Sequence, residues 1–162
     1  MSDITTSIQA IQALKEYKPP GELVFGKHYA PIMMISEYKN GSWGELQMEP
    51  YGPVSLSPAC KVLHYGQEIF EGLKAYKTEE GGPFLFRPIE NFRRMNFSAR
   101  RMAIPEISES IFMNGIREMT SHMAHFIPRR TGESLYIRPF IFATEPNLGI
   151  RASEEFLSLI HI

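Results

Sequence analysis

Three prolines divide the second half of the sequence into segments of helix length. Pro88, Pro105 and Pro128 bound the segments 89–102 and 108–127. Proline suits the first turn of a helix and cannot continue one, so each marks a boundary. Apolar residues recur in both segments at the spacing of one helix face: Phe92, Met95, Ala99 and Met102 in the first, and Ile116, Met119, Met123 and Phe126 in the second. The sequence therefore predicts two helices, 89–102 and 108–127, that each bury one stripe.

The segments around these helices are typical of β-strands. Residues 135–143 alternate and are rich in β-branched and aromatic side chains, which favours a strand. Asn40-Gly41 predicts a hairpin turn that returns through 43–50, and Gly81-Gly82 predicts a second hairpin. Residues 156–162 form a last apolar strand. We expect an α+β fold in which an antiparallel sheet carries the two main helices on one face.

Shorter helices are expected at two further places. Ile8, Ile11 and Leu14 give the segment 6–17 an amphipathic spacing, so it suits a short helix or a flexible arm. Ile69, Phe70 and Leu73 sit at helical spacing within 63–74, with Gly72 as a C-terminal cap. We interpret 1–22 as an N-terminal arm and 23–162 as one small α+β domain.

Composition excludes several classes of function. The chain is 43% hydrophobic and 22% charged with a net charge of −1, so no global field attracts nucleic acid or an anionic membrane. No run reaches the roughly 18 apolar residues of a membrane span. The N-terminus has an early acid and no apolar core of a signal peptide, so we expect a cytoplasmic protein. The single cysteine, Cys60, is interpreted as an inert buried thiol.

No self-contained catalytic motif is present. The sequence has no phosphate loop, no paired cysteines and no nucleophile elbow. His122 and His125 are spaced to share a helix face and could hold a metal. No third ligand stands at convincing spacing, so a solvated helix face is favoured and no metal is expected.

An arginine cluster on the first main helix allows two interpretations. It comprises Arg93, Arg94, Arg100 and Arg101. Arginine binds phosphate through two parallel charge-assisted hydrogen bonds, which makes a phosphate site possible. The ordinary alternative is a solvated face on which Glu90 pairs with Arg94 at i, i+4.

Two tyrosines and a strand arginine are also ambiguous. Tyr65 precedes Gly66, where the backbone can approach a ligand closely. Tyr136 and Arg138 share one face of the predicted strand, and an inward arginine there needs an anion such as a substrate carboxylate. A tyrosine on a strand is more often a core residue with a satisfied hydroxyl.

Four ordered blocks of sequence resemble the branched-chain amino acid aminotransferases. They are LHYGQEIFEGLKAY at 63–76, LFRP at 85–88 with RMNFSARR at 94–101, SLYIRP at 134–139, and EPNLG at 145–149. The resemblance runs from about Phe25 to Leu159. The first block alone also fits D-amino acid aminotransferases and aminodeoxychorismate lyase, which share the fold. The extended first block and the EPNLG loop favour the branched-chain branch.

The resemblance implies a fold-type IV enzyme that uses pyridoxal 5′-phosphate. Such enzymes exchange the amino group of L-leucine, L-isoleucine or L-valine with 2-oxoglutarate, and the protein supplies position and electrostatics. By resemblance, Arg94 would bind the cofactor phosphate and Tyr65 would lie near the substrate carboxylate. Phe70 and Tyr136 would form the wall of the pocket for the aliphatic side chain.

Further roles follow from the same resemblance. Arg138 would meet the second carboxylate of bound glutamate, while Lys74 would lie near the site in a less defined role. Leu148 and Gly149 belong to a loop that would cover the active site of the neighbouring subunit, which implies a homodimer.

The resemblance also implies a missing part. In the family the cofactor-bearing lysine belongs to a large second domain, and none of the lysines at 15, 18, 27, 39, 61, 74 and 77 occupies its motif. We therefore expect a truncated N-terminal domain with no catalytic lysine and no transaminase activity alone. The uncapped last strand also suggests truncation, and its final residues, 157–162, resemble translated adapter sequence. The alternatives are a non-catalytic dimerising or ligand-binding module, and another fold-type IV enzyme such as a D-amino acid aminotransferase.

Overall fold

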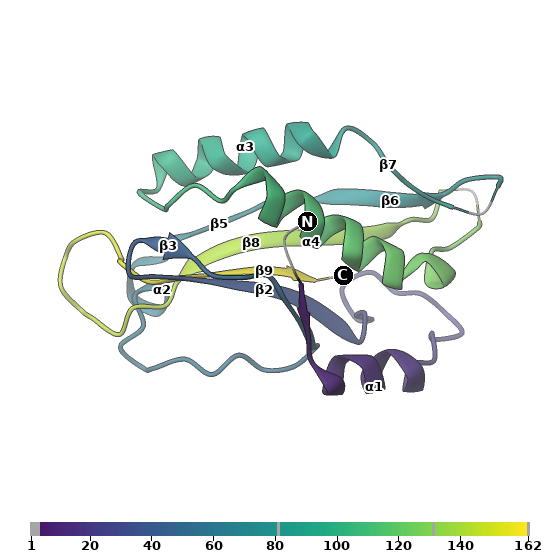
Figure 1. Cartoon of the computed structure of the whole chain (residues 1–162), viewed down its shortest axis with the longest axis horizontal. Helices are drawn as coiled ribbons and strands as arrows, with labels where there is room; N and C mark the ends of the chain where they lie inside the picture. The colour runs from purple at the N-terminus through teal and green to yellow at the C-terminus, as the bar shows by residue number, and fades with distance from the viewer. Residues whose placement is uncertain (1–3, 81, 131, 162) are drawn as a thin grey trace.

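The computed structural model describes residues 4–80, 82–130 and 132–161, and arranges them as a sheet with its longer helices on one face (Figure 1). The strands are β1 (Thr5–Thr6), β2 (Ile32–Lys39), β3 (Ser42–Trp43), β4 (Gln47–Pro50), β5 (Glu68–Phe70), β6 (Leu73–Lys77), β7 (Pro83–Leu85), β8 (Leu135–Ala143) and β9 (Phe156–His161). Their order is β1-β4-β2-β9-β8-β6-β7, with β3 paired to β2 and β5 to β8. The described pairs are antiparallel except β1 with β4, which is parallel.

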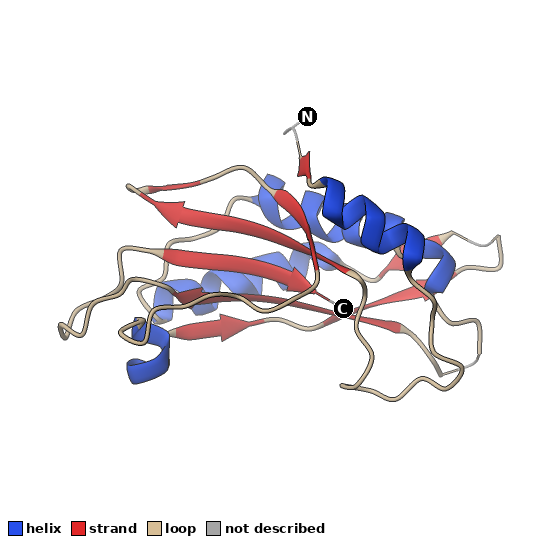
Figure 2. Cartoon of the chain, turned by 90° about the horizontal axis from the view of Figure 1, so that it is seen from below, coloured by secondary structure: helices blue, strands red, loops and turns tan. Residues whose placement is uncertain are grey.

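Three longer helices share the core on one face of this sheet, which Figure 2 shows from below. They are α1 (Ile8–Glu16), α3 (Pro88–Arg101) and α4 (Glu109–His122), and a 3-10 turn follows α4 at Ala124–Phe126. α4 packs on β2 and β9, while α3 packs on β5 and on α4. α1 contacts β4 and β2 and buries Ala10 in the same core. The expected α+β fold with two main helices on one face is confirmed, and α1 adds a third.

The core lies between α4 and the central strands. Ile116 and Met119 of α4 are fully buried with Ile32 and Met34 of β2. Burial of each such side chain contributes about 1.5–3 kcal/mol. Gly115 allows the close approach, because a β-carbon at this position would lie 2.6 Å from Cδ1 of Ile160. The two layers are therefore held together mainly by apolar contacts along α4.

A smaller apolar cluster lies on the opposite face of the sheet. It contains Met33, Phe142, Leu157 and Leu159, and the partly buried Leu56 and Val62 pack against it. Val62 belongs to the short helix α2 (Lys61–Tyr65). Alternation along the strands explains the two clusters, because successive side chains point to opposite faces. The residues before β5 thus cover part of the face that the longer helices leave open.

Both predicted main helices are confirmed, with differences at their ends. Pro88 is the first residue of α3, as expected. Met102 was expected in the buried stripe but is 40% exposed, because the helix ends at Arg101. Asn96 is buried instead, and its side chain donates to the Ile107 carbonyl and accepts from the Ile107 amide, at 2.9 and 3.0 Å. These two bonds fix the connection between α3 and α4.

The second helix ends earlier than the sequence predicts. Ser108 caps α4 by accepting from the Ile111 amide, but the helix stops at His122 rather than near Ile127. A 3-10 turn continues the chain toward Pro128, which agrees with the common tightening of a last helical turn. The N-terminal helix is shorter too, and Ile8 in its predicted stripe is 81% exposed.

The helix predicted within 63–74 is wrong. The helical residues are Lys61–Tyr65, capped by Gly66 in the left-handed conformation at φ 59°. The following residues form β5 and β6, which both pair with β8. The spacing of four residues between Ile69 and Leu73 fits a helix and also fits a strand. Hydrogen-bond pairing with β8 makes both segments strands. Gly72 is therefore not a helix cap.

The two predicted hairpins are present. Asn40 and Gly41 adopt φ 54° and 83° between β2 and β3, as a tight turn requires. The predicted return strand 43–50 is split into β3 and β4. β6 and β7 form the second hairpin, although Gly81 of its expected Gly-Gly turn lies outside the described residues. The strand predicted at 135–143 is confirmed at the same bounds.

Candidate functional site

Arg94 and Glu71 form a two-point ion pair between α3 and the edge of the sheet. Nε of Arg94 donates to Oε1 of Glu71 at 2.6 Å, and Nη2 donates to Oε2 at 2.7 Å. The Glu71 side chain is only 3% exposed, whereas that of Arg94 is 65% exposed. The guanidinium is thus held on one edge and open on the other.

The local backbone explains why Glu71 is available for this pair. Its amide donates to the Pro139 carbonyl at 2.8 Å, but Pro139 has no N–H with which to return the bond. The ladder along β8 is interrupted there, and β5 ends at Phe70 while β6 begins at Leu73. Glu71 and Gly72 therefore form a break in the sheet edge, over which α3 lies.

The Glu71 carboxylate has further donors around it. Asn91, one turn before Arg94 on α3, donates to Oε2 at 2.9 Å and to the Gly72 carbonyl at 3.2 Å. The Gly72 amide donates to Oε2 at 3.3 Å. Burial alone raises the pKa of Glu71, but the bonds from Arg94, Asn91 and Gly72 outweigh it and hold the pKa below the ordinary glutamate value. Glu71 is therefore a charged, buried anchor.

The alternative prediction that Arg94 pairs with Glu90 is wrong. Glu90 pairs with Arg93 at 2.9 Å and with Arg87 at 3.5 Å. Arg94 points away from these residues toward Glu71, and no described group bonds to its Nη1. The Nη1–Nη2 edge therefore remains free for an anion. A guanidinium edge of this kind makes two parallel bonds to a phosphate.

Phe70, Tyr136 and Arg138 meet on the face of the sheet opposite the longer helices. Both Nε and Nη2 of Arg138 donate to the Tyr136 hydroxyl, at 3.1 and 2.8 Å. The Arg138 guanidinium also lies over the Phe70 ring, 4.4 Å from its centroid. Phe25 packs edge-on against Tyr136 at 5.3 Å. The structure thus brings together three of the predicted site residues, and no described carboxylate pairs with Arg138.

Gly72 makes room for this cluster. A β-carbon at Gly72 would lie 2.5 Å from the Tyr136 hydroxyl oxygen, closer than any real contact. The hydroxyl therefore occupies the space that a side chain would need. The same dipeptide, Glu71-Gly72, serves Arg94 on the helix side and Tyr136 on the other side.

Tyr65 and Leu148 form a separate group, in which α2 meets the loop between β8 and β9. Helix α2 and this loop lie at one end of the molecule (Figure 1). The Tyr65 hydroxyl donates to the Leu148 carbonyl, and both side chains are about half exposed. The next carbonyl, that of Gly149, accepts from Nζ of Lys61 at 2.7 Å. Lys74, whose predicted role was less defined, is exposed and stands opposite Tyr136 on β6.

Cys60 and the paired histidines lie in ordinary structural surroundings. Cys60 is fully buried, and its thiol donates to the Ala143 carbonyl at 3.1 Å. His122 lies 3.8 Å from Glu118 on α4, and His125 follows in the 3-10 turn. Within 4–80, 82–130 and 132–161, no three potential ligands gather to hold a metal ion.

The sequences of curated bacterial aminotransferases are similar to most of the chain. It is 40% identical over 147 residues to branched-chain-amino-acid transaminase 1 of Bacillus subtilis, covering 90% of this chain and 41% of that protein. It is 47% identical over 138 residues to the branched-chain-amino-acid aminotransferase of Mycolicibacterium smegmatis, covering 84% and 38%. The chain belongs to the branched-chain aminotransferase family. It spans about two fifths of the length of these relatives, and no protein-family profile matches it.

Solved structures agree with the fold of this chain. The branched-chain aminotransferase of Escherichia coli superposes with a TM-score of 0.55 at 25% identity, over 80% of this chain and 41% of that one. A second solved branched-chain aminotransferase, with pyridoxamine 5′-phosphate, gives 0.51 at 26% identity, over 77% and 38%. A Thermoproteus uzoniensis structure, at 0.57 and 21% identity over 81% and 40%, supports the fold alone.

Sequence reasoning missed several residues that the structure places at the candidate site. Glu71 holds Arg94, Asn91 donates to the Glu71 carboxylate, and Lys61 holds the loop of Leu148. Glu71 stood inside a recognised block, but its partner is 23 residues away and no periodicity links them.

The helices of the described segments include none long and apolar enough to cross a membrane.

Proposed function

We propose that the chain is the small domain of a branched-chain amino acid aminotransferase. The complete enzyme would transfer the amino group of L-leucine, L-isoleucine or L-valine to 2-oxoglutarate with pyridoxal 5′-phosphate. The similarity of nine tenths of the chain to a Bacillus subtilis protein of that name carries the proposal. When bound, the cofactor supplies the electron sink for amino-group exchange.

Arg94 is proposed to bind the cofactor phosphate. Its Nε–Nη2 edge is taken by Glu71, which leaves the Nη1–Nη2 edge exposed with fixed direction. A planar, charged guanidinium edge matches the geometry of a phosphate and can make two bonds to it, so the residues present fit the group. Glu71 would orient the guanidinium rather than touch the cofactor.

The cluster on the opposite face is proposed to form part of the substrate pocket. Phe70 is 63% exposed and offers an apolar wall for an aliphatic side chain, together with Tyr136. Arg138, held by the Tyr136 hydroxyl, would bind the second carboxylate of glutamate or 2-oxoglutarate. An apolar wall with one arginine lets a single pocket accept both side chains. Tyr65 would lie near the α-carboxylate of the substrate.

The loop that carries Leu148 and Gly149 is proposed to cover the active site of a neighbouring subunit in a homodimer. Leu148 and Ile150 are 55% and 96% exposed, and burial against a second subunit would remove this apolar surface from water.

The cofactor-bearing lysine is proposed to lie outside this chain. Lys61 is buried on backbone carbonyls, and Lys77 donates to the carbonyl of Ala124. Neither is placed to form a bond to the cofactor. By resemblance none of the seven lysines of the chain, Lys74 included, occupies the motif of the cofactor-bearing lysine, so the 162-residue chain alone should have no transaminase activity.

Two assays test the proposal. The full-length enzyme should convert L-leucine with 2-oxoglutarate and leave D-alanine unchanged, whereas preference for D-alanine would point to another fold-type IV enzyme. The 162-residue chain is treated with pyridoxal 5′-phosphate and then with borohydride, beside a control protein that has the same number of exposed lysines. The amount of lysyl adduct on the chain should not exceed the amount on the control. Turnover of leucine by this chain alone, together with such an adduct, would refute the proposal that the cofactor-bearing lysine lies outside the chain.

A further inference from the structure

Lys61 is an unusual residue in this structure because it is a lysine with no exposed surface. It is the first residue of α2 and is 0% exposed. Nζ donates to the Gly149 carbonyl at 2.7 Å and to the Arg151 carbonyl at 3.0 Å. A buried ammonium is costly unless it is paired and hydrogen-bonded, so these carbonyls must be held in place for it.

Tyr65 binds the same loop from the next turn of α2. Lys61 and Tyr65 are four residues apart and therefore lie on one face of the helix. The Tyr65 hydroxyl donates to the Leu148 carbonyl, so two side chains of a five-residue helix bind three carbonyls within 148–151. The Lys61 amide adds a bond to the Glu145 carbonyl at 3.1 Å. Helix α2 and the loop 144–155 are thus joined at four points.

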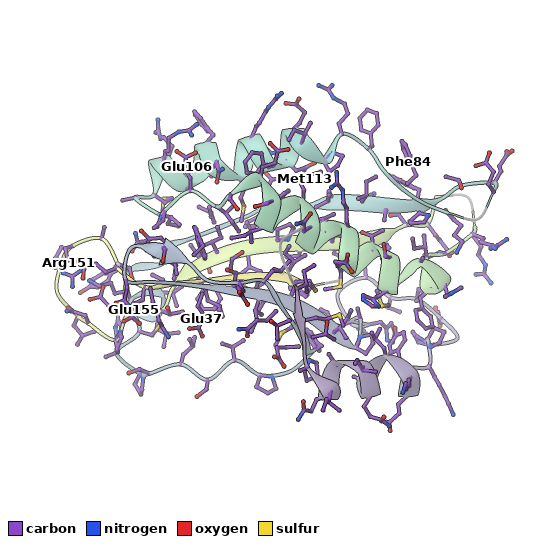
Figure 3. All side chains as sticks on the ribbon, in the orientation of Figure 1. Glu37, Phe84, Glu106, Met113, Arg151 and Glu155 are labelled. Carbon is purple, nitrogen blue, oxygen red and sulfur yellow. The ribbon has the colours of Figure 1, made fainter. Side chains whose placement is uncertain are left out.

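Glu145 closes the network from the other side. It is 8% exposed and accepts from Arg151, at 2.6 Å to Oε1 and 3.2 Å to Oε2. The Glu154 amide donates to its Oε2 at 3.0 Å. Burial raises the pKa of Glu145, but the Glu154 amide and the positive charges of Arg151 and Lys61 outweigh it and lower the pKa. The Arg151 side chain stands at the outer end of the loop in Figure 3.

We propose that Lys61 is a positioning residue that fixes the loop 144–155, and through it the Tyr65 hydroxyl and Leu148, in the geometry that substrate binding needs. This rests on the proposed function, in which Tyr65 and Leu148 contribute to a substrate pocket. A loop ordered in advance costs less conformational entropy when substrate binds. Tyr65 and Lys61 bind the loop through its backbone carbonyls, which leaves the side chains of Leu148 and Ile150 exposed.

The test replaces Lys61 with methionine in the full-length enzyme, which keeps most of the volume and removes the three N–H donors. Lys15→Met is the matched control, because Lys15 is exposed on α1. Hydrogen exchange reports on the loop, since the Gly149 amide donates to Oδ1 of Asn147 at 2.6 Å and the Arg151 amide to the Gly149 carbonyl at 2.9 Å. Kinetics with L-leucine and a pyridoxal 5′-phosphate titration report on function.

Lys61→Met should accelerate exchange of the Gly149 and Arg151 amides by roughly tenfold or more, as expected for losing charge-assisted bonds. KM for L-leucine should rise roughly tenfold while kcat changes less and the dissociation constant of the cofactor stays the same. Lys15→Met should change none of these. Unaltered exchange, or faster exchange with unaltered KM, overturns the proposal.

Tyr65→Phe keeps the proposal testable if Lys61→Met does not fold. Tyr65 is about half exposed, so loss of its hydroxyl leaves the core intact. Exchange within the loop should still accelerate, and unchanged exchange would contradict the joined unit of α2 and loop. An enzyme with wild-type residues that does not act on L-leucine would instead refute the proposed function, while the exchange measurements still decide whether Lys61 fixes the loop.

Discussion

The carboxylate of Glu71 and the guanidinium of Arg94 face each other along two nearly parallel hydrogen bonds of 2.6 and 2.7 Å, one partner buried and the other open to solvent. The buried partner belongs to the interrupted edge of the sheet and the exposed one to α3. The pair therefore joins the two layers of the fold at the point where the candidate phosphate site begins.

Glu71→Gln should lower the stability of the chain. The amide keeps one acceptor, loses the negative charge and turns an N–H₂ group toward the Arg94 or Asn91 donors. Hydrogen bonds to charged groups contribute about 1.5–3 kcal/mol, and exposure of Arg94 reduces that value. The free energy of unfolding in urea should fall by about 1–2 kcal/mol at neutral pH. The control Glu90→Gln removes only exposed pairs and should cost less than about 1 kcal/mol. Equal losses would contradict the role of Glu71.

Acid should destabilise the chain through Glu71 and Glu145. Burial raises both pKa values, but hydrogen bonds and positive neighbours outweigh it and leave both lowered. A lowered folded pKa means that the unfolded chain binds more protons as pH falls below the ordinary value of about 4.3. The stabilisation is therefore complete above that pH and is lost as pH falls through the folded pKa values. Unfolding measured at a series of pH values should show this loss, with a shallower slope in Glu71→Gln. An identical slope in that variant would show that Glu71 does not contribute to the acid destabilisation.

Gly72→Ala should disturb Tyr136 rather than the backbone. The added methyl group would lie 2.5 Å from the Tyr136 hydroxyl, which must move and release Arg138. Overpacking of this kind costs about 1–3 kcal/mol. In the double variant Gly72→Ala with Tyr136→Phe, part of the loss in unfolding free energy should be recovered because the clashing oxygen is gone. If the double variant recovers nothing, the clash lies elsewhere.

Arg138→Met should separate the two kinds of substrate in the full-length enzyme. The guanidinium is proposed to bind the second carboxylate of 2-oxoglutarate, and leucine has no such group. Loss of a charge-assisted bond of about 1.5–3 kcal/mol should raise KM for 2-oxoglutarate by roughly 10–100-fold, with a much smaller effect for L-leucine. Initial-rate kinetics with each substrate varied in turn measure both constants. A parallel rise for both substrates would mean that Arg138 acts on general pocket structure.

Local sequence patterns were sufficient for elements whose pattern repeats over several turns. Pro88 and the stripe through Met95 and Ala99 predicted α3, and alternation predicted β8 at its observed bounds. The same reasoning failed at 63–74, because a short apolar segment fits helix and strand equally well. Pairing of Ile69 with Ile141, far along the chain, decides its structure, and local spacing does not contain that information.

The candidate site was predicted only in part. Resemblance named Arg94, Phe70, Tyr136 and Arg138, and the structure brings the last three together while their roles remain predictions. Glu71 and Lys61 escaped because each acts through partners distant in sequence, Arg94 for one and the Gly149 carbonyl for the other. A backbone carbonyl leaves no sequence signal at all. Supporting residues of this kind emerge only when the fold is known.

The dissociation constant of pyridoxal 5′-phosphate for the full-length Arg94→Gln variant tests the central claim most directly, with Arg93→Gln as the matched control on the same helix. Arg93 pairs only with Glu90 among the described carboxylates, so its loss should leave cofactor affinity unchanged. Arg94→Gln should weaken cofactor binding by roughly 10–100-fold, as expected for loss of a two-point contact of about 1.5–3 kcal/mol to phosphate. An Arg94→Gln enzyme that folds and binds the cofactor as tightly as the control would contradict the account.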